Sequence, residues 1–200
     1  MLDLLPMSAR NLATILLLAC AISVVSCAGS LFKVKPAIEL PPLADNVKSA
    51  SAGGVTVKVA PLMSDEESQD LFEANLPLGG VLPVRMQIDF ESGVPVELKR
   101  ARFRLSDATG REWKALSTKS AVSRILKANE VYSYNPNSRK QFEKEFAAYG
   151  IDLSQPLSSE NRSTHGFVFF EAPNKEPVAS PQGLTLRVER LPQPIEIKLN

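Results

Sequence analysis

The sequence predicts a mainly β protein, an antiparallel β-sandwich of about seven strands with two or three short inserted helices. Residues 82–91 alternate between apolar and polar side chains, which is typical of a strand with one buried and one solvated face. Residues 166–170, 184–191 and 194–199 are short apolar or alternating runs bounded by turn residues. The chain also holds 15 prolines in 200 residues, which suits strands and loops better than long helices.

The remaining strands are predicted from the same alternation. Val55, Val57 and Val59 point one way in a first strand that Pro61 ends. Residues 94–105 form a strand whose phase slips near Arg100, as a bulge or a change of sheet would cause. The turn cluster at residues 106–110 then allows residues 112–116 to pair back.

Helix-start signals predict three helical insertions. Ser64 and Glu67 have the spacing of a capping box for a short helix over residues 65–73. Ser117 is a candidate N-cap for a helix that ends at Lys127. Asn135 followed by proline begins the third helix.

The third helix is predicted to lie against the sheet. Phe142, Phe146 and Tyr149 fall on one stripe, whereas Lys140 lies on the solvated side. A glycine at position 150 is expected to stop the helix as its C′ residue.

The N-terminal segment has the organisation of an export signal. Arg10 precedes an apolar run over residues 12–25, which is shorter than the ~20 apolar residues that a membrane-spanning helix needs. The run ends in Val24-Val25-Ser26-Cys27, which resembles the lipobox of bacterial lipoproteins. The resemblance implies cleavage before Cys27 and attachment of diacylglycerol to its thiol.

Two alternatives to lipidation at Cys27 stay open. The residues that precede Cys20 also fit the pattern, although cleavage there would leave the apolar residues 21–25 on the mature chain. An uncleaved membrane-anchor helix is the other alternative, and Asp3 in the charged region keeps it open. In lipoproteins, an Asp directly after the lipidated cysteine favours retention in the inner membrane. Here that position is Ala28. The lipoprotein resemblance therefore implies a cell-envelope location, at the outer membrane and facing the periplasm.

The chain divides into three regions on this interpretation. Residues 1–26 are the signal peptide, residues 27–53 are a flexible tether rich in proline and small residues, and residues 54–200 are the β-sandwich domain. Within the tether, a short edge strand around residues 34–40, or packing of part of the tether on the domain, is a further possibility. A formal charge of +1, from 23 basic and 22 acidic residues, gives no electrostatic basis for nucleic-acid binding.

The strand pattern carries a second resemblance. The segments VLPVRMQIDFESGVPVELKRARFRLSDATG and HGFVFFEAP resemble immunoglobulin-like domains of bacterial envelope lipoproteins, over roughly residues 54–199. In antibody domains a buried tryptophan packs against a disulfide. Trp113 has no such disulfide beside it, because both cysteines of the chain lie in the signal region. The resemblance implies a fold and no activity.

A catalytic or metal site is not predicted. The one histidine, His165, has Ser163 two residues away, but the chain contains no G-x-S-x-G motif and no phosphate-binding glycine loop. The acids of residues 65–73 lack EF-hand spacing. Met63 and Met86 are too few for a copper site. No cofactor is therefore expected.

A binding role remains. Tyr132 and Tyr134 are aromatic residues in a polar loop and are candidate contacts for a partner. The expected function is that of a non-enzymatic binding or scaffolding lipoprotein. It would be held at the membrane by its lipid and would contact another envelope protein. The alternatives are a periplasm-facing ligand carrier, with the inserted helices covering an apolar cleft, and a small hydrolase that uses His165.

Overall fold

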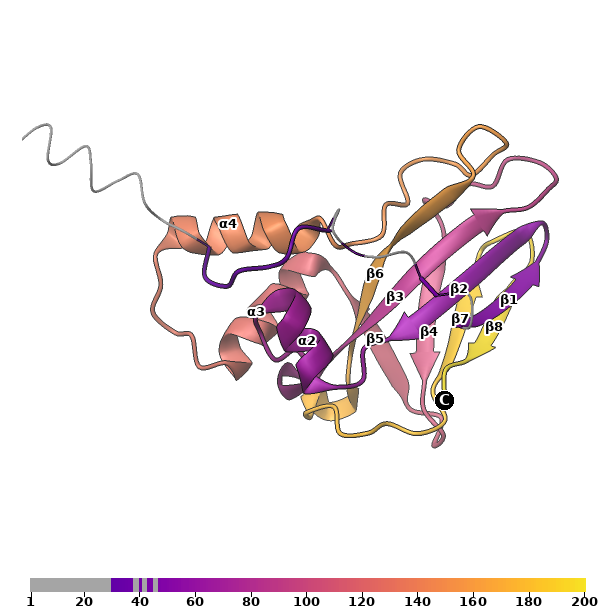
Figure 1. Ribbon diagram of the computed structural model, residues 1–200. Helices are drawn as coiled ribbons and strands as arrows, with labels where there is room; N and C mark the ends of the chain where they lie inside the picture. Colours follow the sequence, from indigo (N-terminus) through magenta and orange to yellow (C-terminus); the bar gives the residue numbers. More distant parts are fainter. Residues whose placement is uncertain (1–29, 38–39, 41–42, 45–46) are drawn as a thin grey trace, which may run out of the picture.

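The computed structural model describes residues 30–37, 40, 43–44 and 47–200, and its strands form one antiparallel sheet (Figure 1). The strand order is β1-β2-β3-β6-β5-β4-β7-β8, and all neighbours are antiparallel. The strands are β1 (Lys48–Ala52), β2 (Val55–Pro61), β3 (Val81–Phe90), β4 (Arg102–Ser106), β5 (Glu112–Leu116), β6 (Ser163–Glu171), β7 (Thr185–Glu189) and β8 (Ile195–Lys198).

The sheet curls until its two edge strands, β1 and β8, lie against each other (Figure 1). The prediction of a mainly β, antiparallel protein with inserted helices is confirmed. An immunoglobulin-like sandwich of two sheets is not confirmed, because β5 pairs with both β4 and β6 and joins the strands into one nearly closed sheet.

The described residues contain the three predicted helices, which lie together at one side of the sheet (Figure 1). They are α2 (Asp65–Phe72), α3 (Thr118–Ala128) and α4 (Pro136–Ala147), and single 3₁₀ turns occur at η2 (Pro77–Gly79) and η3 (Pro173–Lys175). Ser64 and Glu67 form both hydrogen bonds of the predicted capping box, and Ser117 and Asn135 cap α3 and α4 as expected.

Two local predictions are corrected. The phase slip near Arg100 is a turn and not a bulge: the backbone N–H of Ala101 donates to Leu98 O at 2.8 Å, and β4 begins only afterwards. The predicted C′ glycine at position 150 does not end α4. The helix ends at Ala147, with Ala148 as its C-cap in a right-handed conformation.

Strand β6 separates two hydrophobic cores. Val168 and Phe170 point into the curled sheet, whereas Phe167 and Phe169 point outward to the helices. Because both faces of β6 are covered, its sequence is a continuous apolar run instead of an alternating one. The outer core is largely aromatic and centres on Phe72, whose ring contacts those of Phe146, Tyr149, Phe167 and Phe169.

The segment expected to be a tether is partly folded. Residues 48–52 form β1, which pairs along β2 through the two-residue turn Gly53-Gly54, where both glycines have positive φ. Further upstream, Leu31, Phe32 and Val34 pack against the outer core. The folded domain therefore includes β1 and the segment of residues 30–37, and a flexible tether over all of residues 27–53 does not describe it.

Candidate binding cavity

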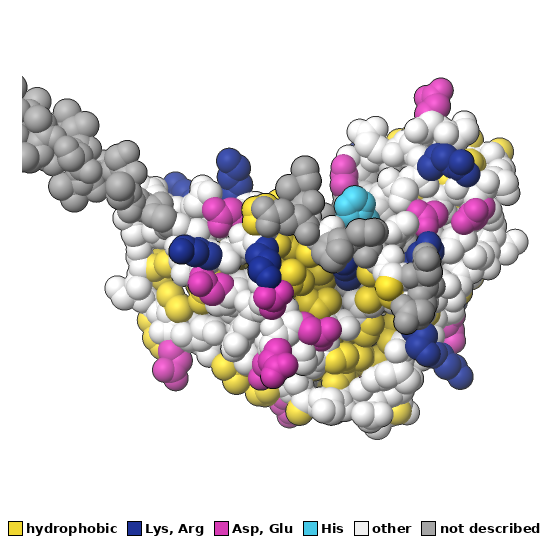
Figure 2. All heavy atoms as spheres, in the orientation of Figure 1, with side chains coloured by type: hydrophobic (Ala, Val, Ile, Leu, Met, Phe, Trp, Pro, Cys, Tyr) yellow, Lys and Arg dark blue, Asp and Glu magenta, His cyan; other side chains and the backbone are white. Residues whose placement is uncertain are grey.

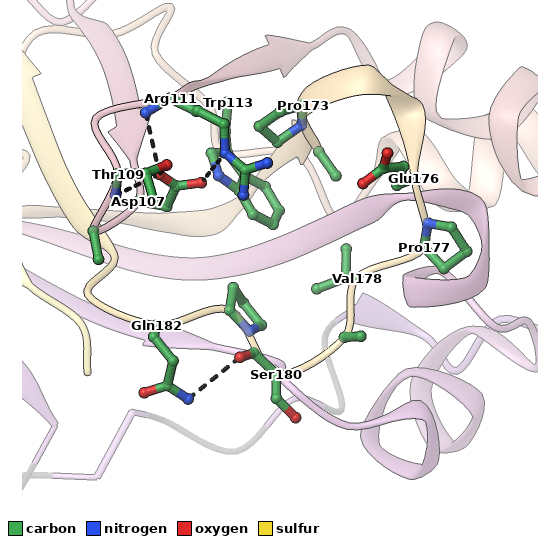
Figure 3. Close-up of a pocket in the computed structure, with 14 residues that line it drawn as sticks. Asp107, Thr109, Arg111, Trp113, Pro173, Glu176, Pro177, Val178, Ser180 and Gln182 are labelled. Atoms are coloured by element: carbon green, nitrogen blue, oxygen red, sulfur yellow. Dashed lines mark hydrogen bonds and ion pairs between the residues drawn. The ribbon is translucent and has the colours of Figure 1, made fainter.

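A cavity lies between the β4–β5 turn and the loop of residues 172–182 (Figure 3). Its volume is about 340 Å³, and it is partly open to solvent. The turn, residues 107–111, supplies polar groups, whereas the loop supplies mainly prolines and Val178, with Glu176 among its polar residues. The cavity therefore has one polar wall and one mainly apolar wall.

Asp107 organises the polar wall. Its Oδ1 accepts hydrogen bonds from the Thr109 backbone N–H at 3.0 Å, from Thr109 Oγ1 at 2.6 Å and from the Arg111 backbone N–H at 3.1 Å, while Arg111 Nε donates to Oδ2 at 2.9 Å (Figure 3). The hydrogen bond from the Thr109 hydroxyl, followed by those from the backbone and Arg111, holds the pKa of Asp107 well below its ordinary value. The carboxylate therefore remains an anion whose role is to shape the turn.

Trp113 lies between the cavity and the inner core. Its side chain is 4% exposed and belongs to the core inside the curled sheet. Its buried indole Nε1 donates to no acceptor among the described residues. A buried indole N–H usually finds a partner, so the Trp113 N–H is a buried donor that the described residues leave unsatisfied.

The loop that forms the apolar wall is tied to the fold at both ends. The backbone N–H of Val178 donates to Pro77 O at 2.8 Å, and the backbone N–H of Ala108 donates to Gln182 O at 3.0 Å. Arg124 of α3 donates to Lys175 O and to Gly79 O, both at 3.1 Å. These bonds attach the loop to the rest of the fold.

The cavity has the chemistry of a binding site. Asp107 is fully hydrogen-bonded and has a lowered pKa, which makes it a poor general base. The Arg111 side chain is 54% exposed, and its guanidinium offers further donors toward solvent. A ligand with a hydrogen-bond acceptor and an apolar part would match the donors of Arg111 and the proline-lined wall, while Glu176 on that wall adds a carboxylate. The sequence showed the turn but gave no sign that the loop returns to it.

The predicted aromatic contacts lie elsewhere, in the connection between α3 and α4. Tyr132 is 74% exposed and contributes to a shallow depression with Tyr134, Arg139 and Lys127. Tyr134 is half-buried, and its hydroxyl accepts a hydrogen bond from Arg139 Nη1 at 2.6 Å. The structure thus places both tyrosines in one patch, and only Tyr132 has most of its surface available to a partner.

His165 lies on the protein surface, where Figure 2 shows the one histidine in cyan. It pairs with Gln87 across the strands, and Ser163 Oγ donates directly to Asp89 Oδ1 at 2.7 Å. Among the described residues, no hydrogen bond joins His165 to the Ser163 hydroxyl or to the Asp89 carboxylate. A nucleophile needs its base within hydrogen-bond reach, so this trio does not form a Ser-His-Asp relay in the structure.

Figure 2 also shows hydrophobic side chains gathered over the junction between the helices and the sheet, surrounded by charged groups. In the described part of the chain, no group of three or more His, Cys, Asp or Glu side chains could hold a metal ion. No helix among those residues is both long and apolar enough to cross a bilayer. Cys20 and Cys27, the predicted lipidation residues, lie outside the described residues.

Comparison of the chain with protein-family models, with curated proteins and with solved structures finds no match.

Proposed function

We propose that this protein is a lipoprotein of the bacterial cell envelope, anchored by a lipid on Cys27, whose folded domain is a non-enzymatic binding or scaffolding module. The observation that carries the proposal is the N-terminal sequence: Arg10, an apolar run of signal-peptide length, then Val24-Val25-Ser26-Cys27. Ala28 at the next position favours the outer membrane, with the domain in the periplasm.

The contacts of residues 30–37 are compatible with this arrangement. Ser30 lies three positions after Cys27, and the chain from there onward packs on the fold. Cleavage before Cys27 would remove the apolar run and leave every helix and strand of the described residues in place. Cleavage before Cys20 would instead leave residues 21–25, an apolar stretch, in the mature protein.

Binding is favoured over catalysis by the surfaces that the fold presents. The cavity beside Asp107 and the exposed Tyr132 are both suited to contact a partner. The hydrolase alternative would need His165 beside a nucleophile, and Ser163 is hydrogen-bonded to Asp89 instead. The carrier alternative would need an apolar cleft between α4 and the sheet, but Phe142 and Phe146 are fully buried there.

Lipidation can be tested by metabolic labelling with a clickable fatty acid. We expect the wild-type protein to take up the label and Cys27→Ser to lose it, while Cys20→Ser is the matched control and retains it. Label that persists in Cys27→Ser but disappears in Cys20→Ser would place the cleavage site upstream. Absence of label from all three proteins would contradict the lipoprotein proposal.

The binding role is tested by pull-down from solubilised envelopes. Arg111→Ala changes the cavity and Tyr132→Ser changes the exposed patch, and neither residue belongs to a hydrophobic core. A partner that is captured by the wild type and lost with one of these variants identifies the binding surface. Intrinsic fluorescence provides a second readout, because Trp113 is the one tryptophan of the chain and lines the cavity.

A further inference from the structure

The segment of residues 30–37 is attached to the helical side of the domain by several independent contacts. The Phe32 ring packs on Phe142 of α4, with centroids 5.0 Å apart. The backbone N–H of Lys35 donates to Leu71 O at 3.0 Å, and the Tyr149 hydroxyl donates to Lys35 O. Backbone hydrogen bonds and an aromatic contact together fix where the chain enters the fold.

This attachment shortens the connection to the membrane. Three residues fully extended span at most ~11 Å, so the lipid-bearing Cys27 lies within that distance of Ser30. A coil of ~25 residues, which the sequence alone suggested, would have a typical end-to-end distance of ~25–30 Å. The fold therefore begins close to the lipid headgroups.

The end of the molecule where the chain enters has features of a membrane-contacting surface. Phe32 contacts α4 through Phe142, and the α3–α4 connection lies at the same end of the molecule as α4 (Figure 1). That connection carries Tyr132, which is 74% exposed, and tyrosines are enriched at the headgroup level of membranes. Lys127 and Lys140 are exposed basic side chains at this end, whereas Arg139 is ion-paired with Glu143 at 2.8 Å.

We infer that the domain rests on the phospholipid surface through the end formed by residues 30–37, α4 and the α3–α4 connection, with Tyr132 at the headgroups. This inference rests on the proposed lipidation of Cys27. The short connection supplies a high local concentration of membrane, and the basic side chains are attracted to anionic lipids. The β3–β4 connection at the far end of the sheet then points away from the bilayer (Figure 1).

Site-directed spin labelling tests this orientation on the full, lipidated chain. The mature sequence has no cysteine besides Cys27, so an added cysteine is a unique labelling site once Cys27 carries its lipid. Ser133→Cys places the label beside an intact Tyr132, and Ser92→Cys is the matched control in the β3–β4 connection; both serines are exposed. The proteins are reconstituted into phosphatidylethanolamine–phosphatidylglycerol vesicles, and label accessibility to oxygen and to a water-soluble nickel complex is measured.

We expect the oxygen-to-nickel accessibility ratio at position 133 to rise at least threefold on reconstitution, and the ratio at position 92 to stay unchanged. Adding Tyr132→Ser to Ser133→Cys should reduce the rise. Equal, water-like ratios at both positions in protein whose lipid is verified by mass spectrometry would overturn the orientation and leave the lipoprotein proposal intact. If mass spectrometry finds no lipid on the protein, both the orientation and the lipoprotein proposal are overturned.

Discussion

The ring of Phe32 lies 5.0 Å from that of Phe142, centroid to centroid, and this contact joins the N-terminal segment to helix α4. Phe142 is fully buried, so Phe32 covers part of the outer core that would otherwise face solvent. Tilted aromatic pairs of this kind contribute ~0.5–1.5 kcal/mol beyond the area they bury. The segment before the sheet is therefore part of the folded domain.

Truncation should show this directly. A protein of residues 54–200 lacks the contact of Phe32 and also lacks β1, which leaves β2 as an unpaired edge strand. We expect it to be less stable than residues 30–200 by about 3 kcal/mol or more, which lowers Tm by roughly 6–12 °C. Differential scanning calorimetry of the two proteins measures the difference, and equal Tm values would show that residues 30–53 add nothing to the fold.

The buried aromatic stripe of α4 predicts a second stability difference. Phe146 is fully buried against Phe72 and Phe169, so Phe146→Ala should cost about 3–5 kcal/mol of unfolding free energy. Lys144 lies exposed on the same helix, and Lys144→Ala should change stability by less than ~0.5 kcal/mol. Urea denaturation followed by circular dichroism compares them. A Phe146→Ala protein as stable as Lys144→Ala would be incompatible with the outer core described above.

The hydrogen bonds around Asp107 predict a pH-dependent contribution to stability. The pKa of Asp107 in the folded protein lies below its ordinary value of 3.8, first because Thr109 donates to it. A carboxyl with a depressed folded pKa stabilises the fold above its unfolded pKa, and this stabilisation is lost as pH falls through the folded value. The free energy of unfolding of the wild type should therefore exceed that of Asp107→Asn at pH 7. The difference between the two proteins should become smaller below about pH 4. A gap that stays constant from pH 7 to pH 2 would show that the charge of Asp107 has no such role.

The two tyrosines of the α3–α4 connection should respond differently to substitution. Tyr134→Phe removes the acceptor of the hydrogen bond from Arg139 and should cost about 1 kcal/mol. Tyr132→Ser, at a side chain that is 74% exposed, should leave stability within ~0.5 kcal/mol and affect only binding. Thermal melts of the two variants test this, and a large loss of stability in Tyr132→Ser would mean that Tyr132 packs on the fold and is not a contact surface.

Elements with a strong local pattern could be predicted from the sequence. The alternation of β3, the caps Ser64, Ser117 and Asn135, and the apolar stripe of α4 all depend on neighbours within one or two turns of the chain. Strand β1 was missed because its sequence, KSASA, has no large apolar side chain. The Gly53-Gly54 pair that follows is a hairpin signal that could have indicated it.

Features that depend on long-range contacts could not be predicted. Strand β5 decides whether the strands form two sheets or one. It pairs with its neighbour in sequence, β4, and also with β6, whose paired residues lie more than fifty positions later. The cavity likewise requires the loop of residues 172–182 to return to the turn at Asp107. Gly166 makes another contact of this kind. Its φ is +156, and because it has no side chain the backbone of Ile151 can approach β6; an added Cβ would lie 2.5 Å from Ile151 Cα. Nothing near Gly166 in the sequence indicates that contact.

The central claim is that the mature chain begins at a lipidated Cys27. Intact-mass and N-terminal peptide analysis of the protein purified from its own membranes tests it most directly. We predict a protein that lacks residues 1–26 and carries diacylglycerol on Cys27, with or without an acyl chain on its new amino group. An unmodified chain that still begins at Met1, or one that begins at Cys20, would contradict the account.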